Sequence, residues 1–103
     1  MQITKTVGNG TVVIKPEGWL DTVSSPELGD VVESVTEAGS MILDFDLVEY
    51  MASAGLRQIL MAHKKSQSLG ASFSIINVCP QVMSIFKMTN IDSKLDIKAK
   101  NPS

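Results

Sequence analysis

Strand-like and helix-like segments alternate along almost the whole chain, and this order constrains the fold more than any other feature. The chain opens with two strand patterns, at residues 2–8 and 11–17, which the sequence Gly8-Asn9-Gly10 separates. Glycine and asparagine tolerate positive φ, so we expect a tight hairpin turn there. Helix and strand patterns then alternate to the end of the chain, which predicts the order β-β-α-β-α-β-α-β.

Three amphipathic helices and three further strands follow from the spacing of the apolar residues. The predicted helices cover residues 26–38, the stretch from Ser53 to Gly70, and residues 80–89. The predicted strands cover residues 41–45, 71–78 and 94–98, the last of them at an edge of the sheet. Right-handed crossovers place the first two helices on one side of a mostly parallel sheet of about five strands, with the third helix close to them or at the sheet end.

Composition fits one small globular domain over residues 1–103, with residues 100–103 as a tail. Hydrophobic residues make up 44% of the chain and charged residues 19%, which are ordinary values for a folded domain. The net charge is −2 and the lysines are scattered, so the chain lacks the basic stripe that nucleic-acid binding requires. We therefore expect no nucleic acid as partner.

Cysteine usage and hydropathy narrow the class further. Cys79 is the single cysteine, so neither an internal disulfide nor a cysteine-based metal site is expected. No signal sequence and no apolar stretch of membrane-spanning length is present. These features predict a cytoplasmic domain that is not inserted in a membrane and carries no cofactor.

A patch of very small residues around Ser53 is the candidate functional site. Ala52, Ala54 and Gly55 flank this serine at the point where an apolar strand pattern gives way to a helix pattern. Free backbone N–H groups and the helix dipole favour an anion at a helix start, so a phosphate added to Ser53 would be stabilised. The local alternative is that Ser53 is an ordinary helix N-cap. Because the patch forms a low surface, we expect bulk at Gly55 to impair binding more than folding.

Other polar residues have structural interpretations. Asp44 and Asp46 share one face of a strand pattern but are too few to hold a metal ion. His63 lies on the apolar side of its predicted helix and is expected in the core or at its boundary. Trp19 lies at a strand exit and Met51 beside the serine, which makes both candidate contact residues.

Two motifs and the order of elements are similar to the STAS domain family, and within it to bacterial anti-sigma factor antagonists. Residues 18–21, Gly-Trp-Leu-Asp, resemble the family's Gly-x-Leu-Asp segment. Residues 43–56 resemble its Leu-Asp-Leu strand, its aromatic-hydrophobic connection and its Asp-Ser-x-Gly-Leu loop. The resemblance covers nearly the whole chain and implies a STAS fold.

The resemblance also implies a partner and a switch. Family members bind an anti-sigma factor that is also a serine kinase, which phosphorylates the loop serine and is thereby released; a phosphatase is a further candidate partner. The matching acceptor is Ser53, and Asp21 matches an acidic position near the partner surface. Ala52 stands where the family has aspartate, so binding without phosphorylation and phosphorylation by a kinase with altered needs both stay open. The implied partner surface consists of Trp19, Asp21, Met51, Ala52, Ser53, Ala54, Gly55 and Arg57.

Two alternatives to an antagonist of transcription regulation follow from the same residues. Small STAS domains also serve as regulatory or assembly subunits of transporters or stress-sensing complexes, a role that does not need the modification. A phosphoryl-transfer enzyme using Asp44 or Asp46 is the other alternative. The chain has no Gly-rich phosphate loop and no nucleophile–base pair within one motif, so we expect no enzyme.

Overall fold

The structure is a computed structural model that describes residues 1–100, so residues 101–103 of the predicted tail lie outside the described part. Lys100, the first residue of that predicted tail, is instead held in place, because its N–H donates to the Val78 carbonyl at 2.8 Å and its Nζ pairs with Asp46. The strands are β1 (Gln2–Gly8), β2 (Thr11–Leu20), β3 (Ser40–Asp44), β4 (Leu47–Met51), β5 (Ser72–Val78) and β6 (Asp96–Ala99). The helices are α1 (Ser25–Glu33), α2 (Ser53–Ser68), α3 (Pro80–Met88) and the short 3-10 helix η1 (Ile91–Ser93).

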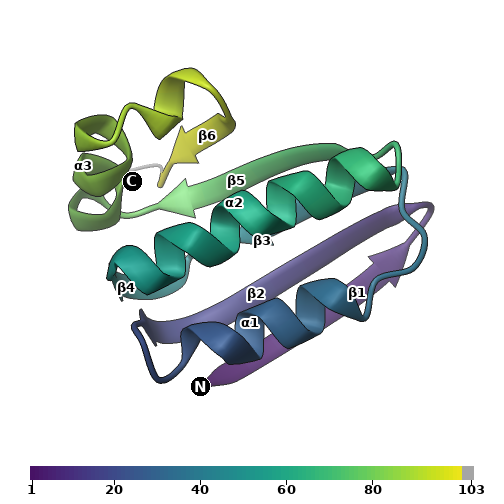
Figure 1. The fold of residues 1–103 in the computed structure, drawn as a ribbon, viewed down its shortest axis with the longest axis horizontal. Helices are drawn as coiled ribbons and strands as arrows, with labels where there is room; N and C mark the ends of the chain where they lie inside the picture. Colours follow the sequence, from purple (N-terminus) through teal and green to yellow (C-terminus); the bar gives the residue numbers. More distant parts are fainter. Residues whose placement is uncertain (101–103) are drawn as a thin grey trace.

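All six strands belong to one mixed sheet (Figure 1). Its main path runs in the order β1-β2-β3-β5-β6, and β4 pairs with the far end of β2. Only the β1–β2 pair is antiparallel, and every other pair is parallel. The predicted α/β domain with a mostly parallel sheet is confirmed, and β6 forms an edge as expected.

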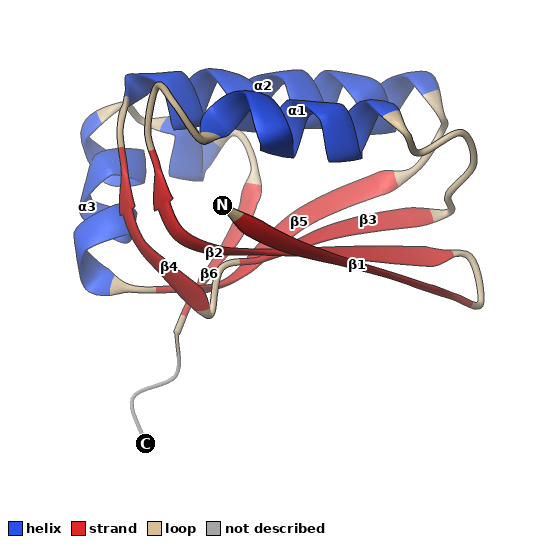
Figure 2. Cartoon of the chain, turned by 90° about the horizontal axis from the view of Figure 1, so that it is seen from below, coloured by secondary structure: helices blue, strands red, loops and turns tan. Residues whose placement is uncertain are grey.

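Helices α1 and α2 cover one face of the sheet. Figure 2 shows α1 and α2 lying side by side on that face, with α3 at one end of the sheet. This arrangement confirms the prediction for all three helices. The core lies between sheet and helices and contains the fully buried side chains of Ile14, Leu43 and Ile59 together with the stacked pair Phe45 and Phe86, whose ring centroids are 6.5 Å apart.

The hairpin between β1 and β2 forms where the sequence predicts it. Gly8 pairs with Thr11, which leaves Asn9 and Gly10 as a two-residue turn. Both turn residues have positive φ, 52° and 79°, as a type I′ turn requires. The turn also anchors the next crossover, because the Gly10 carbonyl accepts hydrogen bonds from the backbone N–H groups of Gly39 and Ser40.

The strand β4 is not indicated by the sequence, in which residues 47–51 resemble a connection between a strand and a helix. Strand β3 ends at Asp44, and the chain turns there: Asp44 Oδ1 accepts a hydrogen bond from the backbone N–H of Asp46 at 3.0 Å. Beyond this turn the chain resumes pairing with β2, now at residues 17–20 instead of 11–14. Tertiary pairing with the long strand β2 therefore creates β4.

Helix α1 is shorter than predicted. It ends at Glu33, with Ser34 as C-cap, instead of continuing to Gly39. Val35 is nevertheless buried beyond the helix, so the apolar spacing there reflects burial rather than helical structure. Ser24 is the N-cap residue of α1, but its hydroxyl makes no bond to the helix and contacts the carbonyl of Trp19 in the preceding strand instead.

We predict that Gly10→Ala destabilises the protein through the turn alone. The φ of Gly10 is +79°, which costs an L-residue about 1–2 kcal/mol, whereas an added Cβ would meet nothing closer than 4.0 Å. The free energy of unfolding, measured by urea titration, should fall by about 1 kcal/mol. The control is Gly8→Ala, where the added Cβ has open space and φ is not in the left-handed region. An equal loss in both variants would contradict the explanation.

Candidate functional site

Ser53 lies at the junction between β4 and α2. Ala52 is the N-cap residue of α2, with extended backbone angles of φ −94° and ψ 176°, and its N–H donates to the Leu20 carbonyl at 2.8 Å. Ser53 is the first helical residue, so the interpretation of Ser53 as N-cap is wrong by one position. The alanine side chain has no hydrogen-bond acceptor, and no side chain within residues 1–100 caps this end of the helix.

The Ser53 hydroxyl is exposed and forms no hydrogen bond within the described part of the chain. The first N–H groups of a helix have no intrahelical partners, and they carry the positive end of the dipole. No acidic residue occupies the first turn of α2. A negatively charged group on Ser53 would therefore meet a favourable electrostatic environment.

Two residues that the sequence interpretation placed on the partner surface are buried. Met51 is 1% exposed and belongs to the core, and Gly55 is also buried. A Cβ added to Gly55 would lie 2.8 Å from Met51 Cγ and 2.9 Å from both Cβ and the carbonyl oxygen of Leu20. Gly55 thus allows α2 to approach β2 closely. The expectation that bulk at Gly55 impairs binding more than folding is wrong, because a larger side chain at Gly55 would displace α2 from β2.

The remaining residues of the predicted surface are accessible to different degrees. Ala52 and Ala54 are half-buried beside Ser53, and Arg57 is exposed one helical turn further along. Arg57 forms no salt bridge with another residue in the range 1–100. At the start of α2, the accessible polar groups of the site are therefore one hydroxyl and one cationic side chain.

Asp21 braces the turn between β2 and α1. Its Oδ1 accepts hydrogen bonds from the backbone N–H groups of Val23 at 3.0 Å and Ser24 at 2.9 Å, and lies 3.1 Å from Ser24 Oγ. The bonds from the backbone and hydroxyl of Ser24, followed by that from Val23, stabilise the carboxylate and lower the pKa of Asp21 below its usual value. The Ser24 hydroxyl also contacts the carbonyl of Trp19, so its single proton is shared between this carbonyl and Asp21 Oδ1. The turn-bracing role that aspartate commonly has is therefore present here.

Trp19 projects from the end of β2 and contacts a residue that the sequence interpretation did not select. It is 60% exposed, and its ring lies 5.5 Å from that of Tyr50, which is 46% exposed. The two residues are paired in the β2–β4 ladder. Tyr50 could be predicted as an exposed strand residue only if residues 47–51 were recognised as a strand, and that strand depends on pairing with β2.

The other polar candidates have structural partners. Asp44 Oδ1 accepts a hydrogen bond from Asn77 Nδ2 at 3.0 Å, and Asp46 forms an ion pair with Lys100 at 3.1 Å. His63 is half-buried, as predicted for a boundary residue, with its ring 5.5 Å from that of Phe73. Within residues 1–100, no group of three histidine, cysteine, aspartate or glutamate side chains is placed to hold a metal ion.

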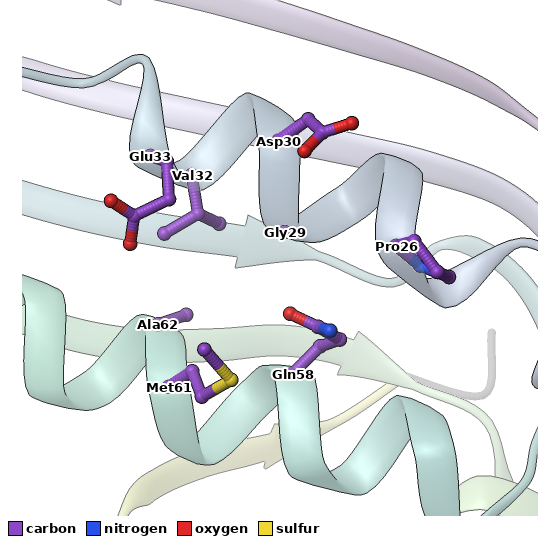
Figure 3. Close-up of a pocket in the computed structure, with 8 residues that line it drawn as sticks. All are labelled: Pro26, Gly29, Asp30, Val32, Glu33, Gln58, Met61 and Ala62. Atoms are coloured by element: carbon purple, nitrogen blue, oxygen red, sulfur yellow. The ribbon is translucent and has the colours of Figure 1, made fainter.

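Helices α1 and α2 also enclose a shallow cavity of about 220 Å³ (Figure 3). Gln58 of α2 points toward Gly29 of α1 across this cavity. A Cβ on Gly29 would lie 2.5 Å from Gln58 Oε1, the far end of a flexible side chain. The helix–helix contact at Gly29 is therefore adaptable, in contrast to the rigid contact at Gly55.

Comparison with known proteins identifies the family. The model of the STAS domain matches residues 2–101, so the chain belongs to the STAS domain family. No helix in residues 1–100 is both long and apolar enough to span a membrane.

Solved structures with the same fold include proteins of more than one kind. An anti-sigma factor antagonist from Mycobacterium paratuberculosis superposes with a TM-score of 0.85 at 19% identity, over 94% of this chain and 84% of that one. The phosphorylated form of the Bacillus cell fate determinant SpoIIAA gives 0.72 at 17% identity, over 93% and 90%. A sulfate transporter family protein from Wolinella succinogenes gives 0.79 at 14% identity, over 91% and 80%. At these identities the likeness establishes the fold alone.

We predict opposite sensitivities for the buried glycine of α2, Gly55, and the half-buried glycine of α1, Gly29. Gly55→Ala should lower the free energy of unfolding by about 1–3 kcal/mol, because the methyl group overlaps Met51 and the backbone of Leu20. Gly29→Ala should be neutral or stabilising by up to about 1 kcal/mol, since Gln58 can rotate away and alanine favours the helix. Urea unfolding of both variants tests this, and equal stability of Gly55→Ala and wild type would refute the close approach.

We predict that Asp21 contributes a pH-dependent part of the stability. Its pKa is lower in the folded than in the unfolded chain, so the contribution is complete above the unfolded value of about 3.9 and is lost as the pH falls through the lowered folded value. Wild type should exceed Asp21→Asn in its urea midpoint near pH 7, and this difference should shrink toward pH 2. A difference that does not change with pH would contradict the role of the carboxylate.

Proposed function

We propose that this STAS domain is an anti-sigma factor antagonist that binds an anti-sigma factor with serine kinase activity. The observation that carries the proposal is the exposed Ser53 hydroxyl, which lies without a hydrogen-bond partner among residues 1–100 at the start of α2. The sequence resemblance puts the phosphorylated serine of the family at this position. Similarity in fold to a structure described as an anti-sigma factor antagonist supports the proposal.

The partner would dock on the end of the domain where β2 and β4 finish and α2 begins. Ser53 and Arg57 are exposed there, and Ala52 and Ala54 keep the surface around the hydroxyl low. In this proposal Met51 and Gly55 support the surface from below and make no contact themselves, because both are buried. Binding, and not catalysis, is the role of the site, and its setting is the bacterial cytoplasm.

Phosphorylation of Ser53 would work as the release switch. The phosphate adds about −1.5 to −2 charges at neutral pH. In the free protein, the helix N-terminus and water stabilise this charge. In the complex, a packed partner removes the water, and burying an unpaired charge is costly. The modification therefore lowers affinity while leaving the fold intact, and a phosphatase would restore binding.

A second candidate function keeps the fold without the switch. Ala52 stands where the family resemblance expects aspartate, so neither a cap nor a carboxylate orients Ser53. The domain would then act as a regulatory or assembly subunit of a transporter or a stress-sensing complex. A transporter ATPase gene beside the gene for this chain, in place of a kinase gene, would favour this candidate.

We predict that Ser53→Asp weakens partner binding and that Ser53→Ala preserves it while abolishing kinase-dependent release. The stability of Ser53→Ala should change by less than about 0.5 kcal/mol, because this serine does not cap the helix. The measurement is a binding titration with the kinase whose gene lies beside the gene for this chain, with and without ATP. Mass spectrometry of the products accompanies it. Ser68→Asp, at the other end of α2, is the control for the added charge.

The same assay separates the two candidate functions through Ala52→Asp. An aspartate at the N-cap should raise the rate of Ser53 phosphorylation if the alanine limits it, and should stabilise the helix by about 1 kcal/mol. Phosphate on another residue, or equal affinity of Ser53→Asp and wild type, would remove Ser53 from the mechanism. Constitutive binding without modification would then favour the assembly subunit.

A further inference from the structure

The aromatic pair at the end of β2 and β4 lines a surface pocket. The pocket has a volume of about 400 Å³ and is lined by Trp19, Glu49, Tyr50 and Gln81. The indole and phenol rings are inclined by 55°, with centroids 5.5 Å apart. A carboxylate and an amide thus share a hollow with two aromatic rings, and none of the basic side chains of residues 1–100 lines it.

An irregularity in the sheet produces this arrangement. The β2–β4 ladder shifts register between Gly18 and Trp19, where Glu49 is an extra residue without a partner in β2. Bulges of this kind redirect side chains. As a result Glu49 and Tyr50, although consecutive in the strand, are both exposed. The next pair along the ladder, Leu20 and Met51, is buried in the core.

The chemistry of the lining selects a cation. The faces of tryptophan and tyrosine rings attract guanidinium and ammonium groups, and a carboxylate adds direct charge attraction. A planar guanidinium can lie on an aromatic ring while it donates hydrogen bonds to a carboxylate and an amide oxygen, which Glu49 and Gln81 supply. We propose that this pocket receives an arginine side chain of the partner protein.

The pocket and Ser53 belong to the same end of the molecule. Leu20, next to Trp19, accepts the hydrogen bond from Ala52 N–H, the residue before Ser53. In this proposal one partner contacts both features, with its arginine in the pocket and another part of its surface at Ser53. The identity of the occupant as the kinase rests on the proposed function, whereas recognition of the guanidinium group does not.

Intrinsic fluorescence tests the pocket directly, because Trp19 is the single tryptophan of the chain. The probe is N-acetyl-arginine amide, titrated at constant ionic strength, and the matched control is N-acetyl-citrulline amide, which has nearly the same shape but no charge. We expect a saturable change with the arginine compound and none with the citrulline compound. No saturable response, or an equal response to both, would overturn the proposal.

Three variants assign the response to the lining residues. Glu49→Gln removes the charge and Tyr50→Leu removes a ring, and each should weaken binding of the arginine compound about two- to fivefold. Tyr50→Phe keeps the ring and should retain affinity near that of wild type. Thermal unfolding checks that each variant is folded, and Glu49 is exposed, so its replacement leaves the core intact. Unchanged affinity in folded Glu49→Gln and Tyr50→Leu would exclude the pocket.

A titration with the candidate kinase separates this inference from the proposed function. Glu49→Gln should weaken that complex by a similar factor, independently of phosphorylation. If the fluorescence response is present but Ser53→Asp binds the kinase like wild type, the switch fails and the pocket stands. If Ser53→Asp weakens the complex but Glu49→Gln and Tyr50→Leu do not, the pocket has no part in docking the kinase.

Discussion

The close packing of α2 against the end of β2 is the contact on which the candidate site depends. Gly55 fits against Leu20 and Met51 without room for a methyl group, and Ala52 N–H donates to the Leu20 carbonyl. These two contacts fix the first turn of α2 on the sheet, and Ser53 lies between the residues that make them. Backbone packing thus sets the position of the hydroxyl, and the serine side chain itself does not cap the helix among the described residues.

The long strand β2 organises the rest of the domain. Its first half pairs with β3 and its second half with β4, so one strand carries both the central sheet and the pairing that delivers the chain to Ser53. The loop after it, braced by Asp21, begins α1. Residues from both strands also line the cation pocket that we propose. Binding features therefore gather at one end of the sheet, where parallel strands finish, as is common in open α/β folds.

The division between supporting and exposed residues changes how the small-residue patch is understood. Small side chains predict that another group can approach the backbone closely. The sequence does not say whether that group belongs to a partner protein or to the protein's own interior. Ala52 and Ala54 leave the outer surface low, whereas Gly55 serves the interior. Met51 is likewise a core residue. The accessible residues within 51–57 are consequently fewer than the predicted surface includes, whereas Trp19, which the prediction also includes, is exposed together with Tyr50.

The sequence by itself determined the class of fold, the hairpin and the approximate position of the three helices. Local physics was sufficient there: Asn9 and Gly10 accept positive φ, and apolar periodicity distinguishes buried strands from amphipathic helices. It also located the start of α2 at Ser53, although the N-cap residue is Ala52. Tertiary structure alone decided the existence of β4, which depends on pairing with β2, and the burial of Met51 and Gly55. It also decided the meeting of Trp19 with Tyr50, because a register shift between strands distant in sequence cannot be derived from the pattern of either strand.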